Sequence, residues 1–251
     1  MSGTLILTWH AVEAGGAPPL CVAPELLARQ LDRIAAAGAE VVTVSELGRR
    51  RRAGTLPGPA VAITFDDGFA SIAAHAAPLL QERGLVATIF CVAGKLGGES
   101  DWAGAGERRP LLTADGVAQL AAAGWEIGAH GLTHAPLGEV EAEEAGEELI
   151  ESRRLLEQVT GAPVTSLAYP YGSLPVDAAA LARAAGYAVA CTTELRRVAP
   201  ADDPFLLPRV DVHYLRRLDL LERALAGRSN AYLRARRLAA RARRLVRADY
   251  A

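Results

Sequence analysis

The chain has 251 residues, of which 51% are apolar and 22% are charged, a balance that is ordinary for a soluble globular enzyme with one large buried core. Its formal net charge of -2 predicts no general attraction to nucleic acid or to anionic lipid. The beginning of the chain lacks the basic and apolar regions of a signal peptide, and no stretch is apolar for long enough to cross a membrane. We therefore expect a cytoplasmic protein.

Short apolar runs alternate with amphipathic segments along most of the chain. The apolar runs predict buried strands at Leu5–Trp9, Glu40–Val44, Ala60–Phe65, Val86–Val92, Trp125–Ala129, Val164–Tyr169 and Tyr187–Cys191. The amphipathic segments predict helices at Pro24–Ala37, Ala73–Arg83, Ala114–Ala123, Glu139–Val159 and Pro175–Ala185. Such β-α units imply a parallel sheet with helices outside it. We expect an irregular (β/α) barrel of about seven parallel strands, and an open doubly wound sheet is the alternative.

Three cysteines, Cys21, Cys91 and Cys191, lie far apart and form no Cys-x-x-Cys pair. An odd, scattered set argues against a disulfide framework and against a thiolate zinc site. Cys91 lies within an apolar run, so we interpret it as a small buried residue.

Polar residues recur where the predicted strands end. His10 ends the first strand, Asp66 and Asp67 end the third, His130 ends the fifth, and Tyr169–Gly172 ends the sixth. In a β/α barrel the carboxyl ends of the strands meet at one rim, where active sites are built. Residues that are distant in the sequence would therefore meet at one site.

Asp66 and Asp67 place two carboxylates side by side. Neighbouring strand residues point to opposite faces, so both carboxylates can serve one site only if the chain turns there. Gly68 makes such a turn plausible. One acid could then bind a cation while the other accepts a proton. The alternative is a solvated Asp-Asp-Gly turn.

His130 and His134 lie four residues apart, a spacing that lets two imidazoles reach one ion at about 2.0–2.1 Å. Adding one aspartate gives a set of two histidines and one carboxylate with open positions for water and substrate. The alternative is one capping histidine and one surface histidine. His75, which lies in a predicted helix, is interpreted as a surface or core residue.

Five segments resemble motifs of the polysaccharide deacetylases, which form carbohydrate esterase family four. Thr64–Gly68 resembles the TFDDG motif, His130–His134 the H-x-x-x-H motif, and Ala168–Gly172 an AYPYG variant of the third motif. Leu5–Val12 is similar to the YHxV segment of permuted members, and Leu207–Val210 to a late LPR(V/I) motif. The resemblance runs in order through most of the chain.

The resemblance implies a metal-dependent hydrolase that removes N-acetyl groups from N-acetylhexosamine units of an oligo- or polysaccharide. Asp67, His130 and His134 would hold a divalent cation, usually zinc in such enzymes. Asp66 would be the general base that activates the attacking water. Rival functions are an amidohydrolase or O-acetyl esterase of the same fold, and a non-catalytic carbohydrate- or membrane-binding relative.

Further roles follow from the same resemblance. His10 would be the general acid, with His213 as the rival, and the backbone N–H of Tyr171 would help to stabilise the oxyanion. The third motif lacks the arginine that orients the base in many members. Arg209 is the candidate to supply that guanidinium to Asp66 from another strand, since a bidentate pair would also keep the base ionised.

The end of the chain is strongly basic. We expect residues 1–215 to form the barrel and residues 216–251 to form a basic helical extension that packs on it or trails from it. This extension is interpreted as a solvated helix in a chain with a single lysine, Lys95, and many arginines. Contact with a membrane surface is the alternative. A long loop that holds Trp102 could form a wall for a sugar, or its tryptophan could simply pack.

Overall fold

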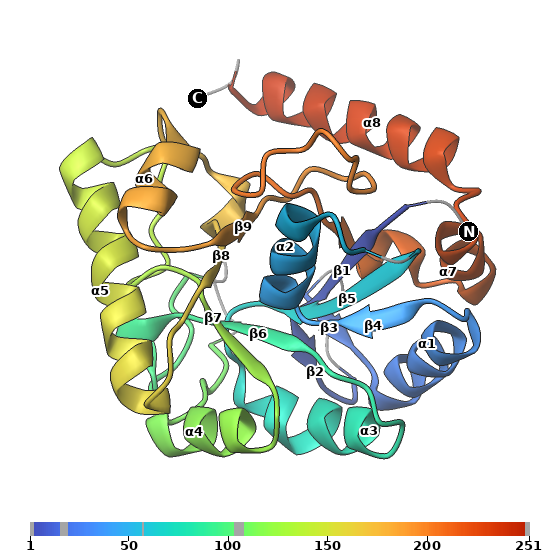
Figure 1. Cartoon of the computed structure of the whole chain (residues 1–251), viewed down its shortest axis with the longest axis horizontal. Helices are drawn as coiled ribbons and strands as arrows, with labels where there is room; N and C mark the ends of the chain where they lie inside the picture. Colours follow the sequence, from blue (N-terminus) through green and yellow to red (C-terminus); the bar gives the residue numbers. More distant parts are fainter. Residues whose placement is uncertain (1–2, 16–19, 57, 103–107, 249–251) are drawn as a thin grey trace.

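The computed structural model describes residues 3–15, 20–56, 58–102 and 108–248 (Figure 1). Within these ranges the main sheet has eight strands, all paired in parallel, in the order β10-β1-β5-β6-β7-β8-β9 with β4 also paired to β5. The strands are β1 (Leu5–Trp9), β4 (Glu40–Val42), β5 (Ala60–Phe65), β6 (Thr88–Cys91), β7 (Glu126–Ala129), β8 (Ser166–Ala168), β9 (Val189–Cys191) and β10 (Val210–Asp211). Two further strands, β2 (Ala11–Val12) and β3 (Cys21–Val22), pair with each other.

The sheet curls into an incomplete barrel. One edge of β5 pairs with all of β1, from Leu5 with Val61 to Trp9 with Phe65, and the other edge is shared between β4 and β6. On the far side, a bridge between Cys191 and Leu207 connects the end of β9 to the segment that leads into β10. This geometry confirms the predicted irregular barrel of about seven parallel strands.

Helices surround the sheet (Figure 1). They are α1 (Pro24–Ala36), α2 (Val44–Ala53), α3 (Ala77–Gln81), α4 (Ala114–Ala122), α5 (Ala142–Thr160), α6 (Ala178–Ala184), α7 (Leu218–Leu225) and α8 (Asn230–Ala248). Short helical turns also occur at η1 (Ile72–Ala76), η2 (Ala93–Lys95), η3 (Pro170–Gly172) and η4 (Val212–Leu215). Among the described residues, no helix combines the length and the apolar character that a membrane span requires.

Helix α2 is absent from the sequence prediction, which extended the preceding strand to Val44. The strand ends at Val42, and the Thr43 hydroxyl accepts a hydrogen bond from the Glu46 N–H as the N-cap of the helix. The second half of α2 is a run of arginines, so it has no apolar stripe to predict it. Buried Leu47 nevertheless packs inside the barrel, so α2 fills the end opposite the carboxyl ends of the strands.

Alternating strand residues divide the core into two clusters. Leu5, Leu7 and Ile63 face the outer helices, whereas Ile6 and Ala62 point into the barrel. Strands β1 and β5 are buried on both faces, which explains why they read as continuous apolar runs.

The three cysteines are free and buried. Burial raises the pKa of both Cys91 and Cys191 to about 12, so these thiols stay protonated at neutral pH. In a Cys21→Ser background, we expect an aromatic disulfide reagent to label both thiols only after denaturant is added. Rapid labelling of the native protein would contradict this burial.

Candidate active site

The chain turns sharply where β5 ends. The Asp66 N–H still donates to the Trp9 carbonyl at 2.9 Å, but Asp67 and Gly68 both adopt a φ of 71°. A Cβ at position 68 would lie 3.3 Å from Cα of Cys91, so a side chain there would be crowded as well as strained. The turn brings the carboxylates of Asp66 and Asp67 to the same rim of the barrel.

Three buried side chains meet at this rim. Oδ1 of Asp67 lies 3.5 Å from Nε2 of His130 and 3.3 Å from Nε2 of His134. The three candidate ligand atoms all lie within 4.8 Å of one another. Tetrahedral zinc with bonds of about 2.0–2.1 Å separates its ligand atoms by roughly 3.3–3.4 Å. The spacing and the donor set therefore fit a single dication with positions left open.

The two histidines are held in different ways. Nδ1 of His130 lies 2.7 Å from the Ala168 carbonyl oxygen, the kind of contact that fixes the ring of a metal-binding histidine. The ring of His134 stacks on Trp102 at 4.3 Å and meets the edge of Tyr171 at 4.5 Å between centroids. One face of Trp102 thus packs against the site, as the packing alternative expected.

Charge in this cluster is concentrated on the aspartate. Burial would raise the pKa of Asp67, but hydrogen bonds from His130 and His134 lower it well below its ordinary value. Burial lowers the pKa of His134, whereas for His130 the bond to Asp67 outweighs burial and its pKa rises. The site thus presents an ionised carboxylate beside two imidazoles.

Asp66 makes the ion pair expected with Arg209. Nη1 and Nη2 of Arg209 contact the two carboxylate oxygens at 2.6 and 2.7 Å, and both side chains are buried. The same guanidinium donates to the carbonyl of Thr192 at 3.1 Å and to the hydroxyl of Thr8 at 3.1 Å. Burial would raise the pKa of Asp66, but the charge of Arg209 lowers it, so the carboxylate stays ionised and oriented.

A cavity of about 670 Å³ opens beside this pair. Asp66, Arg209, His10 and Tyr171 line it. His213 instead lines a small neighbouring pocket that His10 also borders. The geometry therefore favours His10 over His213 as the group that faces a substrate held next to Asp66.

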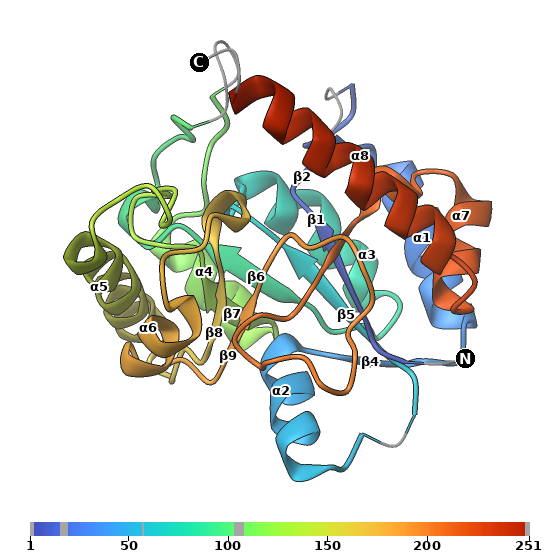
Figure 2. The same cartoon turned by 90° about the horizontal axis from the view of Figure 1, so that it is seen from above.

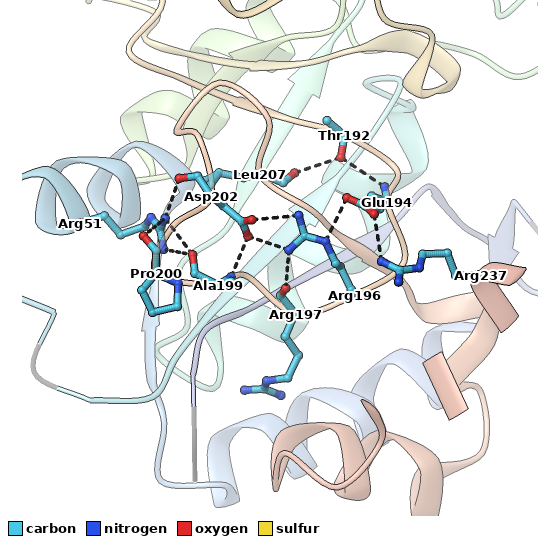
Figure 3. A network of polar contacts seen from close by, with 10 residues as sticks. All are labelled: Arg51, Thr192, Glu194, Arg196, Arg197, Ala199, Pro200, Asp202, Leu207 and Arg237. Carbon is cyan, nitrogen blue, oxygen red and sulfur yellow. Dashed lines mark hydrogen bonds and ion pairs between the residues drawn. The ribbon is translucent and has the colours of Figure 1, made fainter. Parts of the chain in front are cut away.

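The far wall of the cavity includes the basic C-terminal segment. Arg237 of α8 lines the cavity together with Glu194, Arg196 and Tyr214. Nη1 of Arg237 contacts Oε1 of Glu194 at 2.9 Å, and Nε of Arg196 contacts Oε2 of the same carboxylate at 2.9 Å (Figure 3). Helix α8 also packs through buried Leu233 and crosses the barrel as seen in Figure 2.

Polar contacts fix the loop that contains Glu194 and Arg196 and forms this wall of the cavity. Asp202 accepts two hydrogen bonds from Arg196, at 2.7 and 2.9 Å. Arg51 of α2 donates to the carbonyl oxygens of Ala199 and Asp202 at 3.0–3.1 Å (Figure 3). The loop is thus tied to α2 on one side and to α8 on the other.

One buried charge, which lies near the loop that carries His130 and His134, was missed by the sequence analysis. Glu148 of α5 is only 5% exposed and lies on the same buried face as Ala145, Leu149 and Leu156. Helical periodicity assigns Glu148 to the buried stripe of the helix. Because isolated buried charges are costly, a charged residue at such a position indicates a buried polar partner, and the sequence could have revealed this much.

Comparison of the sequence with known protein families identifies the family of this chain. The sequence model of the family described as "Polysaccharide deacetylase" matches residues 53–190, more than half of the chain. The chain belongs to the polysaccharide deacetylase family. Asp66, Asp67, His130 and Tyr171 lie inside the matched region, whereas His10 lies before it.

Solved structures share the fold of this deacetylase chain. IcaB from Ammonifex degensii is 24% identical with a TM-score of 0.74, and the match covers 90% of this chain and 97% of that one. A Streptococcus pyogenes deacetylase, PplD, in complex with acetate is 22% identical with a TM-score of 0.73, covering 82% and 91% of the two chains. At these identities the likeness establishes the (β/α) barrel.

A curated relative gives a partial match. YxkH of Bacillus subtilis (strain 168), whose name also places it among polysaccharide deacetylases, is 27% identical over 152 residues. The match covers 61% of this chain and 51% of YxkH, so it spans about half the length of that relative. The sequence model thus shows the family, and the solved structures show the fold.

Proposed function

We propose that the chain is a metal-dependent deacetylase that removes N-acetyl groups from N-acetylhexosamine units of an oligo- or polysaccharide. The observation that carries the proposal is the arrangement of Asp67, His130 and His134 around one point beside the Asp66–Arg209 ion pair. A cluster of donors alone would suit a structural ion. An adjacent oriented carboxylate that opens onto a cavity suits hydrolysis instead.

The residues divide the chemistry of amide hydrolysis among them. A bound dication, zinc in this proposal, would polarise the acetyl carbonyl and make water more acidic. Asp66 accepts a proton from the attacking water, whose oxygen adds to the carbonyl carbon. His10 gives a proton to the amine nitrogen as the C–N bond breaks, and the products are acetate and a free amino sugar. The N–H of Tyr171 is proposed to stabilise the oxyanion.

The cavity supports a substrate with more than one sugar unit. Its volume of about 670 Å³ lies within the range of roughly 300–1,000 Å³ typical of small-molecule sites, and it reaches from Asp66 to Arg237. Acidic and basic side chains both line it, together with Tyr171 and Leu206. Mixed charge beside apolar surface favours a neutral ligand rich in hydroxyl groups over a polyanion.

Acetate release tests this proposal. The purified protein is incubated with N-acetylated chitooligosaccharides, acetylated xylan and small cyclic amides, with and without chelator. We expect acetate from the chitooligosaccharides, loss of activity with chelator, and recovery when zinc is added. Acetate from xylan alone would favour an O-acetyl esterase, and opening of the cyclic amides alone would favour an amidohydrolase. An inactive, metal-free protein would favour a non-catalytic relative.

Replacing each candidate acid, His10 or His213, by alanine separates their roles. We expect His10→Ala to lower kcat by about 10²–10⁴-fold, the usual contribution of a general acid, with a smaller change in KM. His213→Ala serves as the matched variant and should stay within a few-fold of the wild type, because His213 lies in the neighbouring pocket. Equal metal content in both variants is the control. The opposite ranking would move the acid role to His213.

A further inference from the structure

A buried carboxylate lies directly behind the loop that carries His134. Glu148 accepts hydrogen bonds from the N–H of Leu132 at 2.7 Å, from the N–H of Thr133 at 3.0 Å and from the Thr133 hydroxyl at 2.5 Å. In the described part of the chain, all hydrogen-bond partners of Glu148 belong to this loop. Glu148 therefore binds two consecutive loop residues, Leu132 and Thr133.

The approach of the loop to this carboxylate is very close. Gly131 adopts a φ of 76°, and a Cβ at this position would lie 2.9 Å from Oε2 of Glu148. On its carbonyl side the loop accepts hydrogen bonds from Ala93 and Gly94 of η2, at 3.1 and 2.8 Å. The loop is thus clamped from two sides, by η2 and by the carboxylate of α5.

The ring of His134 packs against Trp102 and Tyr171 but, unlike the ring of His130, is not oriented by a backbone hydrogen bond in the described part of the chain. The ring of His130 is oriented by the Ala168 carbonyl, but within the described residues Nδ1 of His134 is buried without a hydrogen-bond partner. The backbone of His134 also has a φ of 71°, which is strained for a residue with a Cβ and persists only where surrounding contacts enforce it. The adjacent residue, Thr133, makes contacts with Glu148 that enforce this backbone conformation.

We propose that Glu148 is a positioning residue for the metal site: by holding Leu132 and Thr133 it fixes the backbone of His134 and aims Nε2 at Asp67. The inference rests on the proposed metal dependence. It assigns to a helix carboxylate the orienting task that a direct hydrogen bond to the ring usually performs for a metal-binding histidine.

The decisive variant is Glu148→Gln, with Glu147→Gln as its control. In Glu148→Gln the contacts to an ionised carboxylate are lost: the amide nitrogen would either face the N–H of Leu132 or make the Thr133 hydroxyl accept a hydrogen bond in place of donating one. Glu147 is exposed on the same helix, so its variant removes the same charge without touching the loop. We expect Glu148→Gln to weaken zinc affinity by about 10–100-fold, the usual effect of disturbing an outer partner of a metal ligand, and Glu147→Gln to leave it unchanged.

Zinc affinity is measured by calorimetry on metal-free protein, after circular dichroism has shown that the protein is folded. Cobalt is bound in place of zinc to record the visible spectrum of the site. An altered cobalt spectrum in Glu148→Gln supports the proposal. Should that variant not fold, Thr133→Ala removes one of the three donors and is expected to cause a smaller loss of affinity. Wild-type affinity and spectrum in the folded variant, even with a lowered melting temperature, would overturn the proposal. A wild-type protein that binds no metal would overturn the proposed function as well.

Discussion

Replacing Asp67, His130 or His134 singly by alanine is expected to reduce zinc affinity by more than about 100-fold. Disturbing an outer partner of a metal ligand alone costs about 10–100-fold, and these variants remove the candidate ligands themselves. Acetate release should fall in parallel, because water activation and carbonyl polarisation would both be lost. Metal content after dialysis and turnover on an N-acetylated chitooligosaccharide are the two measurements.

His75→Ala is the matched control for these variants. His75 is an exposed residue of η1, and its loss should change neither metal content nor turnover. The three cluster variants should also share one phenotype, because each removes a proposed ligand of the same ion. If one of the three kept wild-type metal content and activity, that residue would have to be removed from the site.

The strand ends explain how much of the site could be predicted from sequence. The predicted bounds of β1 and β5 coincide with the observed ones, because both strands are uninterrupted buried runs. Once parallel strands are assumed, the polar residues that follow them must converge, and Asp67 and His130 do so. The apolar runs and the polar residues that follow them were sufficient to predict these strands and the convergence of these side chains.

Other features depend on contacts that no local pattern encodes. Helix α2 was missed because it meets the barrel through only a few apolar residues, such as Leu47, before its arginine run. Glu148 is visible as an anomaly in a helical stripe, but its target loop is known only from the fold. Likewise, the basic character of α8 does not show that Arg237 reaches the cavity, because that contact depends on how the helix crosses the barrel.

Changes at Arg209 are expected to have the largest combined effect on stability and turnover. Arg209→Met leaves Asp66 as an unpaired buried carboxylate, and breaking a buried ion pair in this way costs about 3–5 kcal/mol of unfolding free energy. Turnover should also fall, since Asp66, the proposed base, loses the contact that orients it. Arg83→Met is the control, because it breaks the surface ion pair with Asp32, and such pairs contribute about 1 kcal/mol or less.

The dependence of stability on pH gives the sharper test of this ion pair. In the wild type the pKa of Asp66 lies below its ordinary value of 3.8, so the stabilisation is present above that pH and is lost as the pH falls through the lowered pKa. Without the guanidinium, burial is opposed only by the charges of His130 and His10, and we expect it to raise the pKa of Asp66 above 3.8. The folded Arg209→Met protein should then gain stability on acidification through that raised pKa, where the wild type does not.

Arg209→Lys distinguishes the charge of this residue from its geometry. Lysine keeps a positive charge near Asp66 but cannot form the two parallel hydrogen bonds of the guanidinium. We therefore expect stability between those of the wild type and Arg209→Met, with kcat still reduced because the carboxylate is ionised but less well oriented. Urea unfolding at several pH values and kcat at neutral pH measure the two effects. Full turnover in both variants would show that Asp66 needs neither the charge nor the contact, and Arg209 would then have to be removed from the proposed mechanism.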